Sequence, residues 1–149
     1  MTVQTAKGQH IRIRLYGIDC PEGRQPYGYE ATETTRSLVL GKQVAIEEVG
    51  QDRYRRTVAI VHLPDGTTLQ ERLLMEGATW VFPPYCTRPE CAKWRDLEQA
   101  ARAEEVGLWH EPEPLPPWEW RSRARNAESR EVGIDRFFVK LTLPPVKSF

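Results

Sequence analysis

Hydrophobic and polar residues alternate along the chain from Gln9 to Ile18. Isoleucine and leucine take every second position at 11, 13 and 15, and the residues between them are His10, Arg12, Arg14 and Tyr16. A period of two is typical of a strand that buries one face, because successive side chains of a strand point to opposite sides. The pattern therefore predicts a strand with Arg14 on the face opposite Ile13.

The segment IDCPEG directly follows this strand. Pro21 lacks the amide that a sheet ladder requires, and Gly23 tolerates turn dihedrals, so the two residues predict that the strand ends here. Asp19 and Glu22 are then expected on a loop at the strand end. For an isolated segment of this composition, simple turn chemistry is the commoner explanation.

The rest of the first 110 residues carries alternating helical and strand patterns. GQDRYRR joins the strand-like segments 43–49 and 57–63, and a Pro-Asp-Gly turn leads from the second of these into a short strand-like segment over 67–69. Glycines at 41, 77 and 107 stand at the expected helix ends, where glycine is a favoured cap. In chain order we expect a helix over 27–40, strands over 43–49, 57–63 and 67–69, and helices over 69–76 and 90–106.

The segment EPEPLPPWEW follows the last of these helices. Its prolines favour an extended conformation, so we expect a strap pinned to the surface by its tryptophans. The mixed order of short strands and helices predicts an α+β fold built around a small antiparallel barrel. We expect one domain over residues 1–110, followed by the strap and a C-terminal tail over residues 111–149.

The composition limits the kinds of molecule that the protein can be expected to bind. The 149 residues are 40% hydrophobic and 28% charged, which is enough for one packed core. Lysine plus arginine equals aspartate plus glutamate at 21 each, so a polyanion would have to be met by a local basic patch. No apolar run approaches the roughly 18 residues of a membrane span, and the N-terminus MTVQTAKGQH lacks the regions of a signal peptide. We expect no membrane partner.

The three cysteines allow two interpretations. Cys86 and Cys91 are close enough in sequence to bridge a short loop, which would suit an oxidising compartment and leave Cys20 as the odd thiol. Three reduced cysteines are an equally good interpretation. A zinc site is disfavoured, because the cysteine spacing is unusual for zinc and the three histidines are scattered.

Five segments taken together resemble the staphylococcal nuclease (thermonuclease) family in order and spacing. They are RIRLYGIDCPE, YGYEA, DRYRRTVA, ERLLMEGATWV and EQAARAEEVGLW. The resemblance covers about residues 2–109, and PPWEWR also resembles the tail of many bacterial members. It implies a five-stranded OB-fold barrel with about three helices, and a calcium-dependent nuclease that cuts phosphodiesters of DNA and RNA.

The resemblance also implies roles for individual residues. Arg14 and Arg56 match the two catalytic arginines of the family, and Glu22 matches the general base. Asp19 matches a metal-ligating aspartate. The backbone carbonyl of Cys20 and the carboxylate of Glu22 are the other expected metal ligands. A further set matches substrate-binding positions: Arg53, Tyr54 and Tyr85.

These roles agree with elementary chemistry. Negative charge grows on a phosphodiester in the transition state of hydrolysis, and two guanidiniums can clamp it. Ca²⁺ prefers carboxylate and carbonyl oxygens, and a carboxylate such as Glu22 can activate a water as base. Each residue also has a simpler interpretation: the arginines of DRYRR could be a solvated hairpin tip, and Trp94 and Trp109 are expected to serve in packing.

The sequence departs from the family pattern at its start. Members carry a second metal-binding aspartate just before the strand that begins here at Thr2, and it is absent from this sequence. We therefore expect a weakened calcium site and a truncated first strand that leaves an unpaired sheet edge. The segment Ile134–Leu143 has strand-like composition and is expected to cover that edge, within the chain or by strand exchange in a homodimer.

Two functions follow from these features. One is an active calcium-dependent endonuclease acting on DNA or RNA. The other is a catalytically weakened or inactive OB-fold module that binds single-stranded nucleic acid or a protein partner, and the missing aspartate favours it.

Overall fold

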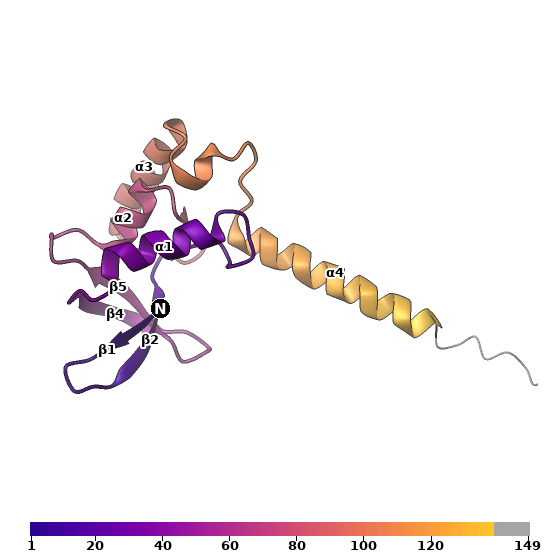
Figure 1. Cartoon of the computed structure of the whole chain (residues 1–149), viewed down its shortest axis with the longest axis horizontal. Helices are drawn as coiled ribbons and strands as arrows, with labels where there is room; N and C mark the ends of the chain where they lie inside the picture. The colour runs from indigo at the N-terminus through magenta and orange to yellow at the C-terminus, as the bar shows by residue number, and fades with distance from the viewer. Residues whose placement is uncertain (139–149) are drawn as a thin grey trace, which may run out of the picture. The chain divides into compact units, whose positions relative to one another are not determined.

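The computed structural model describes residues 1–138, with side chains up to residue 128, and it has the predicted mixed α+β character (Figure 1). The chain divides into two compact units, the first spanning Met1–Pro114 and the second beginning at Leu115. The strands are β1 (Thr2–Gln4), β2 (His10–Leu15), β3 (Ile18–Asp19), β4 (Ala45–Gln51), β5 (Thr57–His62) and β6 (Trp80–Val81). The helices are α1 (Gly28–Val39), α2 (Leu69–Met75), α3 (Glu90–Ala103), the 3-10 helix η1 (Gly107–His110) and α4 (Pro117–Phe138).

The strands of the first unit form two sheets. One has the order β1-β2-β5-β4, and the other pairs β3 with β6. Within residues 1–138 these sheets do not close into a barrel, and the expectation that all strands run antiparallel is wrong for β2 and β5. These two strands are parallel, with Ile13 opposite Thr57 and Arg14 opposite Val58. Parallel neighbours need a long crossover connection, and here α1 and β4 provide it.

The first strand is short but paired. β1 pairs antiparallel with β2 from Thr2, opposite Arg12, to Gln4, opposite His10. The expectation that β2 would be left with an unpaired edge is therefore wrong, because β1 already occupies the place that a C-terminal strand was expected to take.

The helices of the first unit confirm the sequence pattern. The predicted ranges 27–40, 69–76 and 90–106 become α1, α2 and α3 with slightly shorter bounds. The short strand predicted over 67–69 is wrong, since only one bridge joins His62 to Thr68. Thr68 instead caps α2, accepting a hydrogen bond from the amide of Glu71, whose side chain accepts one from the Thr68 amide.

A single core lies between the larger sheet and the helices. Ala59, Ile60 and Val61 of β5 are at most 1% exposed, because helices cover that strand. Gln70 of α2 is buried there and bridges β5, donating to the carbonyl of Ala59 and accepting from the amide of Val61. Trp94 and Trp109 are also buried, which confirms their prediction as packing residues.

The second unit is helical where the sequence predicted an extended strap. α4 begins at Pro117, so the strap prediction is wrong for the end of EPEPLPPWEW. Proline is tolerated at the first turn of a helix, whose amides lack intrahelical partners in any case. The predicted strand Ile134–Leu143 is wrong for Ile134–Phe138, which belong to α4, and residues 139–143 lie outside the described residues. Over residues 1–138, no helix is both long and apolar enough to cross a membrane.

Candidate active site

The loop after β3 holds Glu22 by its backbone. β3 ends at Asp19, opposite Trp80 of β6. The buried side chain of Gln25 accepts a hydrogen bond from the amide of Glu22 at 3.0 Å, and the amide of Gln25 donates to the carbonyl of Glu22 at 2.8 Å. The sequence analysis did not identify Gln25 as a site residue. A glutamine within an acidic turn is one signal that could have identified it.

A glycine fixes the other side of this loop. Gly28 begins α1, and a Cβ built there would collide with the carbonyl oxygen of Glu22. Only the absence of a side chain lets the helix start approach the loop this closely. The position of Glu22 therefore depends on contacts with both Gln25 and Gly28.

The thiol of Cys20 is hydrogen-bonded within the protein and is not placed as a metal ligand. Its Sγ donates to the hydroxyl oxygen of Thr79 at 3.4 Å. Burial raises the pKa of the Cys20 thiol to about 11, with a further contribution from the nearby Asp19 charge. The thiol is therefore protonated at neutral pH, and the backbone carbonyl is the atom of Cys20 suited to a hard cation.

The predicted site residues Arg14 and Tyr85 lie close together. The guanidinium carbon of Arg14 is 5.9 Å from the centre of the Tyr85 ring, within the range of a cation–π contact. Tyr85 is 64% exposed, and its other neighbour is the ring of Phe82 at 5.2 Å between ring centres. An exposed aromatic ring beside a guanidinium can stack on a nucleic-acid base.

A disulfide joins Cys86, the residue after Tyr85, to Cys91, and it decides between the two interpretations of the cysteines. Cys20 is the free thiol. Gly17 packs directly against this disulfide: a Cβ there would lie 2.7 Å from the sulfur of Cys86 and 2.8 Å from the ring of Trp94.

The tip of the β4–β5 hairpin is organised by Asp52. One carboxylate oxygen, Oδ1, accepts the amides of Tyr54 and Arg56 at 2.9 Å each. The other oxygen, Oδ2, accepts Nε of Arg56 at 2.7 Å. Desolvation raises the pKa of Asp52, but the hydrogen bonds from Arg56 and Tyr54 outweigh it and leave the pKa below its ordinary value. Asp52 is thus an anion that orients both the turn and the guanidinium of Arg56.

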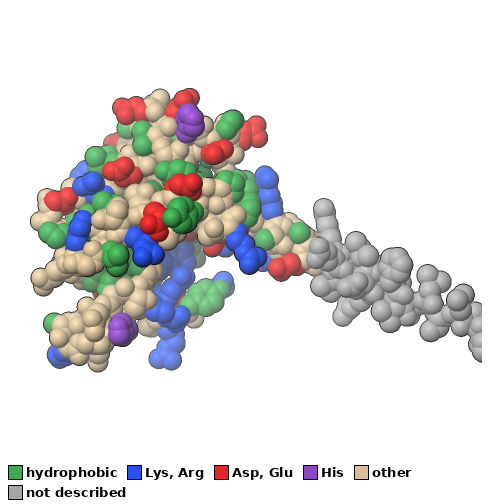
Figure 2. All heavy atoms as spheres, in the orientation of Figure 1, with side chains coloured by type: hydrophobic (Ala, Val, Ile, Leu, Met, Phe, Trp, Pro, Cys, Tyr) green, Lys and Arg blue, Asp and Glu red, His purple; other side chains and the backbone are tan. Residues whose placement is uncertain are grey.

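Tyr54 lies at the centre of a basic cluster on this hairpin. Its ring centre is 4.8 Å from the guanidinium carbon of Arg53 and 5.6 Å from that of Arg56. Its carbonyl accepts Nη2 of Arg12 at 3.1 Å. Figure 2 shows basic side chains gathered at this end of the sheet, whereas most acidic side chains in that view lie over the helices. A neutral protein would need a local basic patch of this kind to bind a polyanion.

The parallel pairing of β2 and β5 sets one predicted catalytic arginine on β2 and the other directly before β5. Arg56 directly precedes Thr57, the first residue of β5, and Thr57 pairs with Ile13, so Arg56 is level with Arg12 and two positions from Val58, the partner of Arg14. Among residues 1–128, no group of three or more His, Cys, Asp or Glu side chains converges as a metal cage. The predicted ligands Asp19 and Glu22 are therefore not gathered with a third side-chain ligand.

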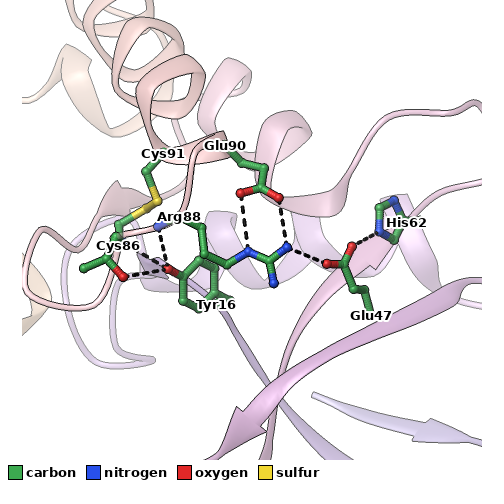
Figure 3. Close-up of polar contacts among 8 residues, drawn as sticks. Tyr16, Glu47, His62, Cys86, Arg88, Glu90 and Cys91 are labelled. Carbon is green, nitrogen blue, oxygen red and sulfur yellow. Dashed lines mark hydrogen bonds and ion pairs between the residues drawn. A yellow bond between two sulfur atoms is a disulfide. The ribbon is translucent and has the colours of Figure 1, made fainter.

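A second polar network lies beside the disulfide, and the sequence did not predict it (Figure 3). Arg88 donates through Nη2 to Glu47 at 2.7 Å and to Glu90 at 3.1 Å, and His62 contacts the other oxygen of Glu47 at 2.9 Å. The hydroxyl oxygen of Tyr16 accepts the amides of Thr87 and Arg88 at 3.0 and 3.1 Å. The network ties β4, β5 and the start of α3 to the disulfide loop.

Comparison with known proteins places the chain in a family. The family model described as "Staphylococcal nuclease homologue" matches residues 12–111, more than half of the chain. An "Uncharacterized endonuclease" of Escherichia coli O157:H7 is 41% identical over 113 residues, which are 76% of this chain and 72% of that protein. The chain therefore belongs to the staphylococcal nuclease family.

Plant relatives are similar over a smaller share of their length. "Probable staphylococcal-like nuclease CAN1" of Oryza sativa subsp. japonica is 41% identical over 129 residues, which are 83% of this chain and 38% of that protein. "Staphylococcal-like nuclease CAN1" of Arabidopsis thaliana is 42% identical over 116 residues, 78% of this chain and 35% of that protein. This chain thus spans well under half the length of these plant relatives.

Proposed function

We propose that this protein is a metal-dependent endonuclease that hydrolyses phosphodiester bonds of DNA or RNA. Membership of the staphylococcal nuclease family and the nuclease names of its relatives support the reaction class. The observation that carries the proposal is the parallel pairing of β2 with β5, because it sets Arg14 on β2 near Arg56, which directly precedes β5. Two guanidiniums so placed can bind one phosphate from two sides.

In this proposal the arginines stabilise the transition state. A guanidinium stays ionised throughout the working pH range, and its fork of donors matches phosphate oxygens. Asp52 occupies Nε of Arg56, so this contact leaves the terminal nitrogens of Arg56 available for phosphate. The contact of Arg14 with the Tyr85 ring is a stacking contact and consumes none of its five N–H donors.

Glu22 is the proposed general base. It lies on the loop that follows β3, half-buried, with its backbone fixed by Gln25. A carboxylate can remove the proton of an attacking water when that water is held within hydrogen-bond reach. A fixed backbone restricts where the carboxylate of Glu22 can reach.

Ca²⁺ is the proposed cofactor, and the donor chemistry suits it. The Asp19 and Glu22 carboxylates and the Cys20 carbonyl are hard oxygen donors, whereas the Cys20 thiol is protonated and turned toward Thr79. Since no third acidic side chain joins them within residues 1–128, most of the coordination would fall to carbonyls, water and substrate oxygens. When bound, the cation would orient the attacking water and offset charge on the phosphate.

Arg53, Tyr54 and Tyr85 are the proposed substrate-binding residues. Tyr54 is 54% exposed and Tyr85 is 64% exposed, and each ring has an arginine against it. Exposed rings beside guanidiniums can stack on bases while the cations hold the backbone, without sequence preference.

Digestion of single-stranded DNA and RNA, with Ca²⁺ and with a chelator, tests this function. We expect cleavage with Ca²⁺ and its loss in chelator, and a Glu22→Gln variant should fold but not cleave. Cleavage that persists in chelator would contradict the metal requirement. Absence of cleavage with Ca²⁺ would contradict the proposed endonuclease activity.

A second function is a non-catalytic module that binds single strands. The small number of converging acidic side chains in the described part of the chain favours it, because it weakens a calcium site. Salt-sensitive binding of single strands without cleavage in any divalent cation would support this alternative, and turnover would exclude it.

A further inference from the structure

Arg12 is a basic residue of β2 with no role assigned so far. It lies two positions before Arg14, and the alternation of β2 puts both on the face opposite the buried Ile13. Residues two apart on a strand are separated by roughly 6.6 Å, so the two guanidiniums form a row along the strand. Arg12 is exposed to solvent.

The sheet register sets Arg12 beside the proposed active site. Ile13 pairs with Thr57 in the parallel β2–β5 ladder, so Arg12 is level with Arg56, the residue directly before β5. Its Nη2 donates to the carbonyl of Tyr54, which anchors the side chain at the hairpin tip. Arg12, Arg14 and Arg56 therefore belong to one continuous basic surface.

Within residues 1–128, Arg12 takes part in no ion pair. The ion pairs found among residues 1–128 include Arg56 with Asp52 and Arg88 with two glutamates, but none includes Arg12. Its hydrogen-bond acceptor at Tyr54 is a neutral carbonyl, which positions the guanidinium without cancelling its charge. The Arg12 guanidinium is therefore fixed in position, takes part in no ion pair among residues 1–128, and lies beside the proposed site of the scissile phosphate. It is suited to bind a second phosphate.

We propose that Arg12 binds the phosphate adjacent to the scissile one, so that the nucleic-acid strand runs along β2 from Arg14 to Arg12. A single strand presents one phosphate per nucleotide, and a guanidinium displaced along the row meets the neighbouring phosphate. This inference rests on the proposed nuclease function and adds to it a binding subsite. It implies a preference for substrates that carry at least one phosphate beyond the bond that is cut.

The alternative role for Arg12 is a brace that merely holds the hairpin through Tyr54. The two roles differ in the number of counterions released on binding, because only a phosphate contact releases one. They also differ with substrate length, because a brace would matter equally for every substrate.

The binding test uses the full chain with Glu22→Gln as background, Ca²⁺, and a labelled single-stranded DNA 12-mer. Adding Arg12→Gln should reduce the slope of log K against log salt by about 0.7, the contribution of one phosphate of a single strand. Arg12→Lys should keep the slope, and Arg95→Gln, an exposed arginine of α3, is the matched control. An unchanged slope in Arg12→Gln would overturn the inference.

The cleavage test compares the wild-type chain and Arg12→Gln on two substrates. On the single-stranded 12-mer we expect kcat/KM to fall on the order of tenfold, the effect of one charge-assisted contact. On a dinucleoside monophosphate, which has no neighbouring phosphate, we expect a much smaller loss. Equal losses on both would identify a brace, whereas a wild-type chain that cleaves neither would refute the nuclease function itself.

Discussion

The carboxylate of Asp52 holds the guanidinium of Arg56 from its Nε side, with 2.7 Å between Nε and Oδ2. The Asp52 side chain is only 13% exposed and that of Arg56 is 33% exposed, so this pair is better shielded than most surface ion pairs. The same aspartate closes the hairpin turn through Oδ1. One residue therefore fixes both the backbone and the head group of a proposed catalytic arginine.

Asp52→Asn should lower kcat with a small effect on folding. The asparagine oxygen can still accept hydrogen bonds from the amides of the turn. The NH₂ group that replaces the second carboxylate oxygen is a donor, so it cannot accept the hydrogen bond from Nε of Arg56. Asp65→Asn is the matched control, because Asp65 also closes a turn and pairs with Arg72, away from the proposed site. Steady-state kinetics and thermal unfolding of both variants check this. Equal activity of the two variants would contradict a positioning role for Asp52.

Replacing either arginine of the proposed phosphate clamp should reduce catalysis strongly. For Arg14→Ala and for Arg56→Ala we expect a loss of about 2.7–4 kcal/mol of transition-state stabilisation, the range seen for one lost electrostatic donor. Because the proposed mechanism has both arginines bind one phosphate, the double variant should lose less than the sum of the single losses. Arg36→Ala on α1 serves as a control for general charge effects. Near-normal kcat/KM in either single variant would remove that arginine from the mechanism.

Gly28→Ala should displace the loop that carries Glu22. The added Cβ would collide with the Glu22 carbonyl, and this neighbour is backbone that cannot rotate away. We expect reduced kcat together with some loss of stability. Gly23→Ala in the same loop is the control, because no atom lies within 4 Å of a Cβ built there. If both variants retained wild-type kcat, the position of Glu22 would not depend on this contact.

Reduction of the Cys86–Cys91 disulfide should destabilise the protein modestly. The bridge spans a sequence separation of 5, and closing so short a loop in the unfolded chain contributes about 2 kcal/mol on the chain-entropy model. Urea unfolding with and without dithiothreitol measures the difference. The variant with both cysteines replaced by serine should not respond to dithiothreitol, and an unchanged wild-type midpoint would contradict the prediction.

Glu47 should contribute to stability in a pH-dependent way. Its hydrogen bond to His62, followed by the contacts with Arg88, holds the pKa of Glu47 below its ordinary value of 4.5. A carboxyl with a depressed pKa stabilises the fold fully above its ordinary pKa and loses that effect as the pH falls through its folded-state pKa. Urea unfolding of wild type and Glu47→Gln should therefore differ most at neutral pH. The difference should shrink below about pH 4.5, and a difference that grew on acidification would contradict this assignment.

The local elements followed from the sequence because their periods are local. The alternation around Ile13 and the glycine stops at 41, 77 and 107 identified β2 and the ends of three helices. Arg14 and Tyr85 were named from family resemblance, and the structure brings them together. The roles assigned to these residues remain predictions.

Features that depend on distant contacts could not be found this way. The parallel pairing of β2 and β5 is a property of the crossover between them, and no local pattern encodes it. The contact of Arg12 with Tyr54 joins residues 42 positions apart, and nothing in either segment signals it. The prolines of EPEPLPPWEW favour an extended chain, but proline is equally compatible with the start of a helix, so this segment alone does not reveal the helix that begins at Pro117.

The closed loop between Cys86 and Cys91, which begins directly after Tyr85, bears on the entropy cost of binding a ligand at Tyr85. The disulfide and the hydroxyl of Tyr16 hold the flanking backbone in the free protein, so its conformational entropy is already lost on folding. A base that stacks on Tyr85 would therefore order little of the neighbouring backbone on association. Binding at this ring should therefore be close to a rigid docking event.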